Sequence, residues 1–434
     1  MTEAHTQKGL TKSLGLVRLS LYGIGTIIGA GIYAVIGPVA EAAGSAIWLS
    51  FVLAALISAL TGLSYAELAS SLPSAGAEHS FLRQAFPKVP AFAFSIGLFI
   101  ALHGAATFAT VGLTFGNYLV LFLKAEPKVV AVSLMAIATA LNIAGVKKAS
   151  AVGAVLTIAQ VGCLLVFAAL ALSTSKTNTA EIFSAPQDWS GVLTGAAIAF
   201  FIYSGYEHMA TMSEEAKDPE RDIWRAFMVA LFVTTAVYFL VILGVQSLID
   251  VQSLKAAKFP LVDAARTMGE PLAVVIGGAA LLATANAVLS ASLSGSRLLF
   301  GMARSNDLPK LLSVTKGKNG SPWIAALVFF AVATAFAVLG EIKFVASMSS
   351  LGVTLVFASV NVAVVALRYT KPKLKRPFSV PSLGRLPLTA ILGAVTSLLL
   401  ATQYEWKVYA VFFGAMALGA MPYALFLRRG RARK

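Results

Sequence analysis

A run of glycines inside an apolar stretch is the most unusual spacing of residues in this sequence. Residues 23–38 read GIGTIIGAGIYAVIGP, with glycines at positions 23, 25, 29, 31 and 37. Because a glycine in a helix interior costs about 0.5–1 kcal/mol relative to alanine, the cluster favours a broken helix that exposes backbone N–H groups. At membrane depth such a break is tolerated only inside protein or along a water-filled cavity. The alternative is close helix packing, since Gly25 and Gly29 have GxxxG spacing.

A second interruption falls in a later apolar stretch, at residues 199–226, beside titratable side chains. Ser204 and Gly205 break the apolar run, and Glu207 and His208 follow soon after. An acidic residue at the centre of a membrane helix costs about 2.5–3.5 kcal/mol on insertion scales. We therefore expect Glu207 to face the interior of a helix bundle or a water-filled vestibule.

The composition shows what kind of elements must hold these two stretches. Of the 434 residues, 58% are hydrophobic and only 12% are charged, whereas soluble domains carry about 25% charged residues. Apolar runs long enough to cross a bilayer recur from end to end. We predict an all-α polytopic membrane protein that forms a single domain over residues 1–434. The single cysteine, Cys163, excludes an intramolecular disulfide and a cysteine-based metal cluster.

We predict twelve transmembrane helices. They lie near residues 15–42, 47–71, 90–123, 129–146, 150–173, 190–215, 225–248, 270–303, 321–340, 343–368, 385–403 and 406–427. The two interrupted helices are the first and the sixth, so they occupy corresponding places in two five-helix halves. An odd number of helices per half makes the second half inverted relative to the first. Discontinuous helices in equivalent places of inverted repeats indicate the binding site of a transporter.

The net charge of +15 raises the question of a nucleic-acid partner, but the distribution of charge argues against one. Most of the 34 Lys and Arg residues fall in segments that lie on one side of the membrane if twelve helices are counted. The positive-inside rule makes that side the cytoplasm and places both termini there. The basic tail at residues 428–434 would then face anionic lipid headgroups.

Six motifs, spread from about residue 15 to 385, resemble the amino acid–polyamine–organocation (APC) superfamily of permeases. They are GIGTIIGAGIY, YAELASSLPSAGAE, LNIAGVKKAS, FIYSGYE with EEAKDPERDI, ATANAVLSASLSGSRLLFGMARSNDLP and KPKLKRPFSVPSLG. The branch that looks most similar is that of cationic amino acid transporters and prokaryotic amino acid permeases. The resemblance implies a five-plus-five inverted-repeat core, at residues 15–173 and 190–368, with two accessory helices at 385–427. It also implies alternating access around a site at mid-membrane.

The resemblance also implies which residues bind the substrate. In the family, the unwound part of helix one binds the substrate carboxylate through backbone N–H groups, and carbonyl groups of helix six bind the α-ammonium. The corresponding residues for the carboxylate are Ile27, Ile28, Gly29, Ala30 and Gly31. Those for the ammonium are Phe201, Ile202 and Ser204. Tyr203 and Tyr206 would be aromatic gates beside the site, or ordinary packing residues.

The sequence leaves both protons and sodium as candidates for the coupling ion. Many relatives carry a lysine in helix five, and the matching position here is Gln160, which neither titrates nor carries charge. If protons are coupled, the candidates are Glu207 and His208, with His103 behind them; His103 could equally hydrogen-bond a neighbouring helix. If sodium is coupled, its ligands would be the carbonyls of Gly25 or Ile28 and side chains of helix eight. Those side chains are Thr284, Asn286 and Ser290.

We expect a secondary transporter of α-amino acids in the cell membrane, coupled to protons or working by exchange in preference to sodium. No P-loop, HExxH motif or cysteine cluster is present, so we expect no enzyme activity, no cofactor and no metal. The alternatives are a polyamine or amine antiporter of the same fold and, from another class, an ion channel. A polyamine would require several acidic residues in the site, and a channel would require a polar ring or a symmetric filter. The sequence does not specify the preferred amino acid, the direction of transport or the oligomeric state.

Overall fold

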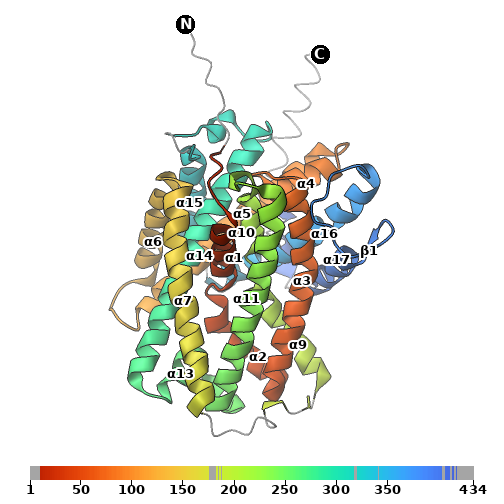
Figure 1. Cartoon of the computed structure of the whole chain (residues 1–434). Coiled ribbons are helices and arrows are strands. Elements are labelled where there is room, and N and C mark those ends of the chain that lie inside the picture. The colour runs from red at the N-terminus through yellow and green to blue at the C-terminus, as the bar shows by residue number, and fades with distance from the viewer. Residues whose placement is uncertain are drawn as a thin grey trace, which may run out of the picture.

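The computed structural model shows a bundle of helices that run roughly side by side (Figure 1). It describes residues 10–174, 182–183, 185–186, 188–316, 320–340, 342–402, 406–410, 413–414 and 417. The predicted twelfth helix, residues 406–427, falls largely outside the described residues, and the tail at 428–434 falls wholly outside them.

The helices follow the predicted spans closely. Up to residue 174 they are α1 (Leu16–Ile27), α2 (Gly31–Ala43), η1 (Gly44–Ala46), α3 (Ile47–Ser71), α4 (Ala77–Ala85), α5 (Pro90–Leu119), α6 (Pro127–Ile143) and α7 (Val146–Thr174). After residue 188 they are α9 (Trp189–Phe200), η2 (Phe201–Tyr203), α10 (Tyr206–Thr211), η3 (Ser213–Glu215), α11 (Pro219–Leu248), α12 (Val251–Ala256), α13 (Pro260–Arg266), α14 (Glu270–Arg304), η4 (Lys310–Ser313), α15 (Trp323–Leu339), α16 (Ile342–Thr370) and α17 (Leu388–Ala401).

The first glycine-rich stretch contains a real break, as the sequence predicts. Helix α1 ends at Ile27, and Ile28 has φ −77° and ψ 62°, which is outside the helical region. Helix α2 begins at Gly31 after Ala30, whose side chain cannot accept a hydrogen bond from the first turn. The N-terminal N–H groups of α2 therefore point into the break without a side-chain cap.

The second break is also where the sequence predicts it. Helix α9 starts after Asp188, whose carboxylate accepts hydrogen bonds from the backbone N–H groups of Ser190 and Gly191. Hydrogen bonds from the Ser190 hydroxyl and from these two N–H groups hold the pKa of the exposed Asp188 carboxyl below its usual range. The helix continues as η2 to Tyr203, Ser204 is extended, and Gly205 has φ 122° before α10 begins.

Other helices enclose the two broken ones. Helix α1 packs against α7, α11 and α14, and α2 packs against α9, while α3 packs against both α9 and α11. In Figure 1, α1, α2 and α10 lie behind α7 and α11, with α5 and α14 further back. Both breaks therefore sit inside the bundle, where backbone without helical hydrogen bonds is tolerated.

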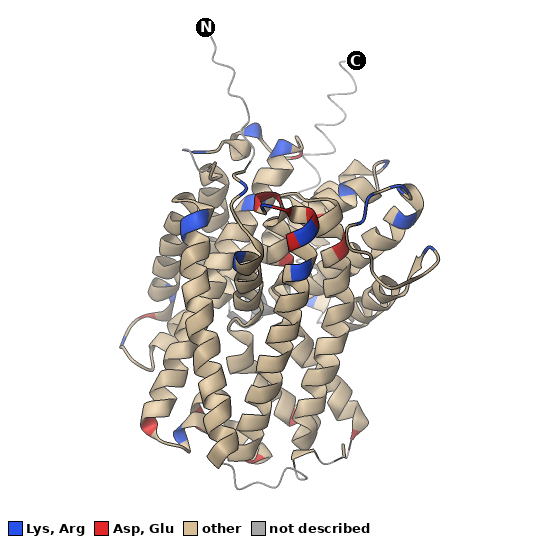
Figure 2. Cartoon of the chain, in the orientation of Figure 1, with Lys and Arg blue, Asp and Glu red and all other residues tan. Residues whose placement is uncertain are grey.

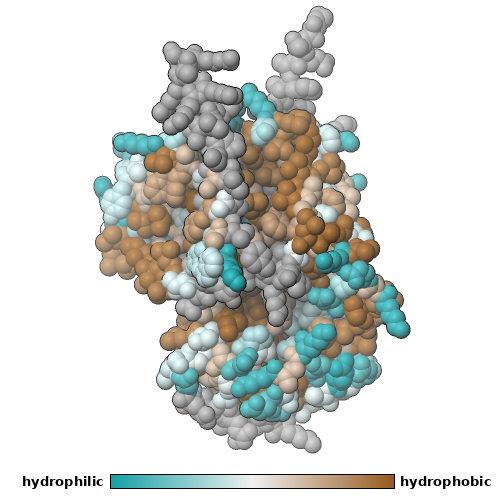
Figure 3. Space-filling model, turned by 180° about the vertical axis from the view of Figure 1, so that it is seen from behind, coloured by the Kyte–Doolittle hydropathy of each residue, from teal (hydrophilic) through white to brown (hydrophobic). Residues whose placement is uncertain are grey.

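The surface of the bundle is suited to lipid. Six helical stretches are long and apolar enough to cross a membrane, and four shorter apolar helices accompany them among the described residues. Figure 3 shows hydrophobic side chains over much of the visible flank and hydrophilic ones in separate patches, chiefly toward the lower end. The chain is therefore an all-α polytopic membrane protein. Its only strands in the described residues are β1 (Ser382–Leu383) and β2 (Leu386–Pro387), which form a small antiparallel hairpin.

Charge is distributed unequally between the two ends of the bundle. In Figure 2, Lys and Arg gather at the upper end, and the lower end carries mainly Asp and Glu.

Three short helices, α4, α12 and α13, were not predicted, because each is too short to show a clear apolar period. The local signals were present: Asp250 caps α12 through the N–H of Ser253, and Pro260 occupies the first position of α13.

Candidate substrate site

The two breaks touch each other through glycine. A methyl group added to Gly205 would lie 2.6 Å from the carbonyl oxygen of Thr26 and 3.0 Å from the amide nitrogen of Ile27. A methyl group added to Gly31 would lie 2.6 Å from Cγ2 of Ile202. Real Cβ atoms do not approach other atoms so closely, so glycine lets the backbones of the two broken helices come into contact.

A tyrosine that the sequence analysis did not single out joins the two breaks. The hydroxyl of Tyr238 on α11 donates to the carbonyl of Ile27 at 2.8 Å and lies 3.2 Å from the carbonyl of Ile202. Its ring packs edge-on against Tyr203, with ring centroids 5.1 Å apart. Nothing in the apolar stretch around Tyr238 distinguishes it, because its role depends on which helix faces the breaks.

The ends of the half-helices carry opposite partial charges. The start of α2 presents uncapped N–H groups and the positive end of a helix dipole, whereas the end of η2 presents carbonyl groups and a negative end. Helix α2 packs against both α9 and η2. The arrangement therefore offers donors for an anionic group and acceptors for a cationic group a short distance apart.

The structure brings the predicted binding residues together at the two breaks. Ile27, Ile28 and Gly29 are buried, whereas Ala30, Gly31, Phe201 and Ser204 are only half-buried. The half-buried residues thus belong to the start of α2 and to the second break, which is where a ligand would need access.

The two predicted aromatic gates differ in their surroundings. Tyr203 is buried, and its hydroxyl donates to the carbonyl of Phe51 at 3.3 Å. Tyr206 is also buried and stacks on Phe357 with ring centroids 5.0 Å apart, next to Tyr65. Both tyrosines therefore pack against other aromatic rings beside the second break, Tyr203 against Tyr238 and Tyr206 against Tyr65 and Phe357.

The structure also joins two residues that the sequence analysis treated separately. The side-chain amide of Gln160 on α7 donates from Nε2 to the carbonyl of Ile28 at 2.9 Å. Its Oε1 is buried and has no hydrogen-bond partner among the described residues. The carbonyl of Ile28, a candidate sodium ligand, thus accepts a hydrogen bond from the neutral amide of Gln160.

The candidates for proton coupling lie on α10 and α5. The carboxylate of Glu207 accepts a hydrogen bond from the N–H of Gly205 at 2.7 Å, so it caps the start of α10. The Nδ1 atoms of His208 and His103 are buried without a hydrogen-bond partner in the described part of the chain. His103 packs on Gly352 of α16, where an added methyl group would lie 2.6 Å from its Nδ1.

The candidate sodium ligands have the following partners in the structure. The amide of Asn286 donates to the hydroxyl of Thr157 at 2.8 Å, and both side chains pack on Gly25. The hydroxyl of Thr284 instead donates to the carbonyl of Ala280 in its own helix at 2.8 Å. The carbonyl of Ser290 accepts from the hydroxyl of Tyr22 at 3.2 Å.

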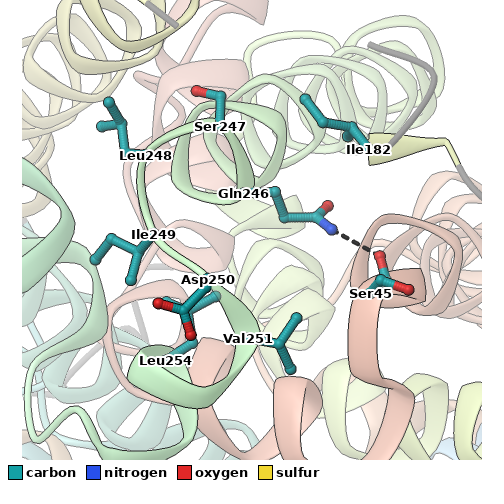
Figure 4. Close-up of a pocket in the computed structure, with 9 residues that line it drawn as sticks. All are labelled: Ser45, Ile182, Gln246, Ser247, Leu248, Ile249, Asp250, Val251 and Leu254. Atoms are coloured by element: carbon teal, nitrogen blue, oxygen red, sulfur yellow. Dashed lines mark hydrogen bonds between the residues drawn. The ribbon is translucent and has the colours of Figure 1, made fainter. Parts of the chain in front are cut away.

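A cavity of about 350 Å³ lies at the far end of α2, between η1, the end of α11 and α12 (Figure 4). The side-chain amide of Gln246 crosses it to the carbonyl of Ser45 at 2.7 Å, as the dashed line in Figure 4 shows. None of the residues predicted to bind substrate lines this cavity.

Charged and polar residues in or beside the six motifs pair with one another near the end of the bundle at which α1 starts. Arg297 of α14 is 1% exposed and donates from Nε to Glu215 at 2.8 Å and from Nη1 to Asn142. Glu67 of α3 pairs with Arg368 at 2.7 Å and with Arg376 at 3.2 Å. A charged residue inside a predicted span was the available signal for Arg297.

Replacing Tyr238 with phenylalanine is expected to reduce transport without unfolding the protein. The variant leaves two carbonyls of the broken helices without their shared donor, and an unsatisfied buried polar group costs about 1–3 kcal/mol. A loss of roughly 10- to 100-fold in uptake rate is the expected result. Uptake by reconstituted protein measures it, with Tyr22→Phe as the control, because the Tyr22 hydroxyl donates to Ser290 of an unbroken helix. Equal losses in both variants would contradict a special role for Tyr238.

Comparison with known proteins identifies the family of this chain. The sequence profile of the family described as "Amino acid permease" matches residues 14–427. The chain is similar to the branched-chain amino acid permease BcaP of Bacillus subtilis, with 28% identity over 98% of this chain and 94% of the relative. It is also similar to the methylthioribose transporter of Bacillus subtilis, with 27% identity over 97% of this chain and 95% of the relative.

A plant relative extends the comparison beyond bacteria. The vacuolar cationic amino acid transporter 4 of Arabidopsis thaliana is 30% identical over 84% of this chain and 64% of the relative. A family profile that covers nearly the whole chain confirms the resemblance seen in the motifs. The chain belongs to the amino acid permease family of the APC superfamily, whose members are transporters and not enzymes.

Proposed function

We propose that this protein carries α-amino acids across the cell membrane by alternating access, with the substrate bound between the two helix breaks. The observation that carries the proposal is the contact between the uncapped start of α2 and the carbonyl end of η2. An α-amino acid has a carboxylate and an ammonium on one carbon, so it can satisfy both helix ends at once. The charge distribution supports a cytoplasmic position for the end at which α1 starts.

This arrangement fits an amino acid better than a polyamine. A polyamine would leave the N–H groups of α2 unpaired and would require acidic side chains for its several charges. Glu207 is the acidic residue predicted at the site, and it already accepts the N–H of Gly205. The same engagement of Glu207 favours substrates with neutral side chains over cationic ones.

For coupling, we propose protons or substrate exchange in preference to sodium. The amide of Gln160 donates to the carbonyl of Ile28, and the hydroxyl of Thr284 donates within its own helix, so each of these candidate sodium ligands already has one hydrogen-bond partner. Glu207, His208 and His103 are the titratable candidates near the second break. Gln160 itself cannot exchange a proton.

Uptake by proteoliposomes tests the proposal. Radiolabelled leucine, alanine, lysine, putrescine and methylthioribose would be compared with and without an inward proton gradient and with sodium replaced by choline. For proton coupling, we expect saturable leucine uptake that a protonophore abolishes and that does not depend on sodium. Uptake stimulated only by internal amino acid would support exchange. Putrescine or methylthioribose uptake without amino acid uptake would contradict the proposed substrate class.

The variant Glu207→Gln separates the capping role of this residue from a role in proton coupling. Glutamine keeps an oxygen that can accept the N–H of Gly205, but it cannot titrate. If Glu207 carries the coupled proton, uptake driven by a proton gradient falls at least about tenfold, while exchange between internal and external amino acid is retained. Glu41→Gln, at an exposed position of α2, serves as the control. Unchanged gradient-driven uptake in Glu207→Gln would assign the proton to another group.

A further inference from the structure

A second cavity, of about 530 Å³, lies at the start of α1 and is lined by positive charge. Its lining residues are Lys12, Ser13, Gly15, Leu16, Val17, Arg18, Lys147 and Lys217. The four basic residues come from three separate parts of the chain, namely the segment around α1, the first turn of α7 and the segment after η3. None of the described residues that line the cavity is acidic.

The charges of this cavity are not neutralised within the described part of the chain. Lys12, Arg18, Lys147 and Lys217 are exposed, and none of them forms an ion pair with a described residue. Four like charges around one cavity repel one another, so their placement favours a bound anion.

A buried hydroxyl marks the same cavity independently of the charges. Ser13 is only 6% exposed, and its hydroxyl is buried without a hydrogen-bond partner among the described residues. Buried polar groups are usually hydrogen-bonded, so the unpaired hydroxyl of a residue that lines the cavity has a hydrogen bond to offer a ligand. The start of α1 adds further donors, because Gly15 offers no side-chain cap to the first turn.

The segment that carries Ser13 is held in place by backbone hydrogen bonds. The N–H groups of Ser13 and Leu14 donate to the carbonyl of Glu215 at 2.8 and 3.0 Å, and the N–H of Lys217 donates to the carbonyl of Leu14 at 2.8 Å. These bonds form a parallel bridge between Leu14 and Ala216. Lys12, Ser13 and Lys217 therefore reach the cavity from a fixed backbone, which lowers the entropic cost of binding.

Apolar side chains accompany the basic ones, because Leu16 and Val17 also line the cavity and exposed valines follow Lys147 along α7. Val17 is 70% exposed, and on α7 the side chains of Val152 and Val155 are 38% and 67% exposed. A ligand with an anionic head and hydrocarbon chains fits this combination of a basic cavity beside a lipid-facing flank. The most abundant such ligand at the surface of a bilayer is an anionic phospholipid.

We propose that the cavity binds the phosphate group of an anionic phospholipid, with the Ser13 hydroxyl and the N–H groups of α1 as donors and the four basic side chains as counter-charges. The bound lipid would tie the start of α1 to α7 and to the segment after η3. Because α1 leads directly to the first helix break, the lipid would steady the half-helix on which that break depends. The binding step does not depend on which substrate is carried.

Native mass spectrometry of the full-length protein tests the proposal. The protein would be reconstituted in vesicles of equal parts phosphatidylcholine and phosphatidylglycerol, extracted in mild detergent and examined for retained lipid. Wild-type protein is expected to retain phosphatidylglycerol selectively. The variant Lys12→Gln/Lys147→Gln/Lys217→Gln is expected to bind it on the order of a hundredfold more weakly, since each basic residue near a membrane surface contributes to attraction of anionic lipid.

A second triple variant provides a matched control. Lys148→Gln/Lys310→Gln/Lys373→Gln removes the same charge from exposed positions that do not line the cavity, and it should retain lipid like the wild type. Equal loss in the two triple variants would overturn the proposal, because it would show attraction by net charge alone. A further experiment adds soluble glycerol phosphate as a competitor of the bound lipid. If it displaces the lipid at similar concentration, the cavity recognises a free phosphate ester, and the assignment to a lipid is wrong.

Discussion

Gly205→Ala is expected to lower amino acid uptake on the order of a hundredfold while the protein remains in the membrane. The residue has φ 122°, and a methyl group there would lie 2.6 Å from the carbonyl oxygen of Thr26. Backbone strain of this kind costs about 1–3 kcal/mol, and the steric overlap adds to it. Because the overlapping atom is backbone, it can be relieved only by moving the two broken helices apart. Uptake by proteoliposomes containing matched amounts of protein measures the effect.

Gly384→Ala is the matched control for this variant. Gly384 also has a positive φ, of 60°, but a methyl group there would meet nothing within 4 Å. It lies in the turn between β1 and β2, away from both breaks. Uptake by Gly384→Ala is expected to stay close to that of the wild type. If Gly205→Ala also transports normally, the two breaks do not need to touch, and the proposed site is wrong.

Arg297→Met is expected to be the most destabilising single change in the polar cluster that Arg297 forms with Glu215 and Asn142. Arg297 and Glu215 are each 1% exposed, and their side chains lie 2.8 Å apart. Removing the arginine leaves a buried carboxylate without its partner, which costs about 3–5 kcal/mol. Thermal denaturation in detergent, followed by size-exclusion chromatography, should show a clear loss of folded protein at temperatures that the wild type survives.

Two further variants separate charge from packing. Arg266→Met removes an arginine of an exposed pair, 49% exposed and 2.7 Å from Asp263, and it is expected to change stability by less than about 1 kcal/mol. Arg297→Met/Glu215→Gln removes both buried charges and is expected to recover part of the loss. If Arg297→Met is as stable as Arg266→Met, the buried pair does not hold this end of the bundle together.

The sequence predicted the positions of the membrane helices and of both helix breaks because these depend on local composition. Apolar length placed α3, α5 and α14 within a few residues of their observed bounds. Glycine at positions 31 and 205 marked the breaks because it tolerates close approach and, at Gly205, a positive φ. The family resemblance then named residues at the breaks that the structure brings together.

What the sequence did not show are contacts between residues far apart in the chain. Tyr238 meets Ile27 across 211 positions, and Arg297 meets Asn142 across 155. Such pairs depend on which helices become neighbours, and periodicity within one helix cannot give that. Gln160 was noticed for its place in helix five, but its bond to Ile28 followed only from the packing of α7 against α1.

The most direct test of the central claim is competition for leucine binding by two analogues of leucine, each lacking one charged group. Isoamylamine lacks the carboxylate, and 4-methylpentanoate lacks the ammonium. If the start of α2 binds the carboxylate and the end of η2 binds the ammonium, each analogue loses a charge-assisted set of hydrogen bonds, worth about 1.5–3 kcal/mol. Leucine should then displace radiolabelled leucine at concentrations roughly 10- to 100-fold lower than either analogue requires. Displacement by isoamylamine as effective as that by leucine would contradict the account.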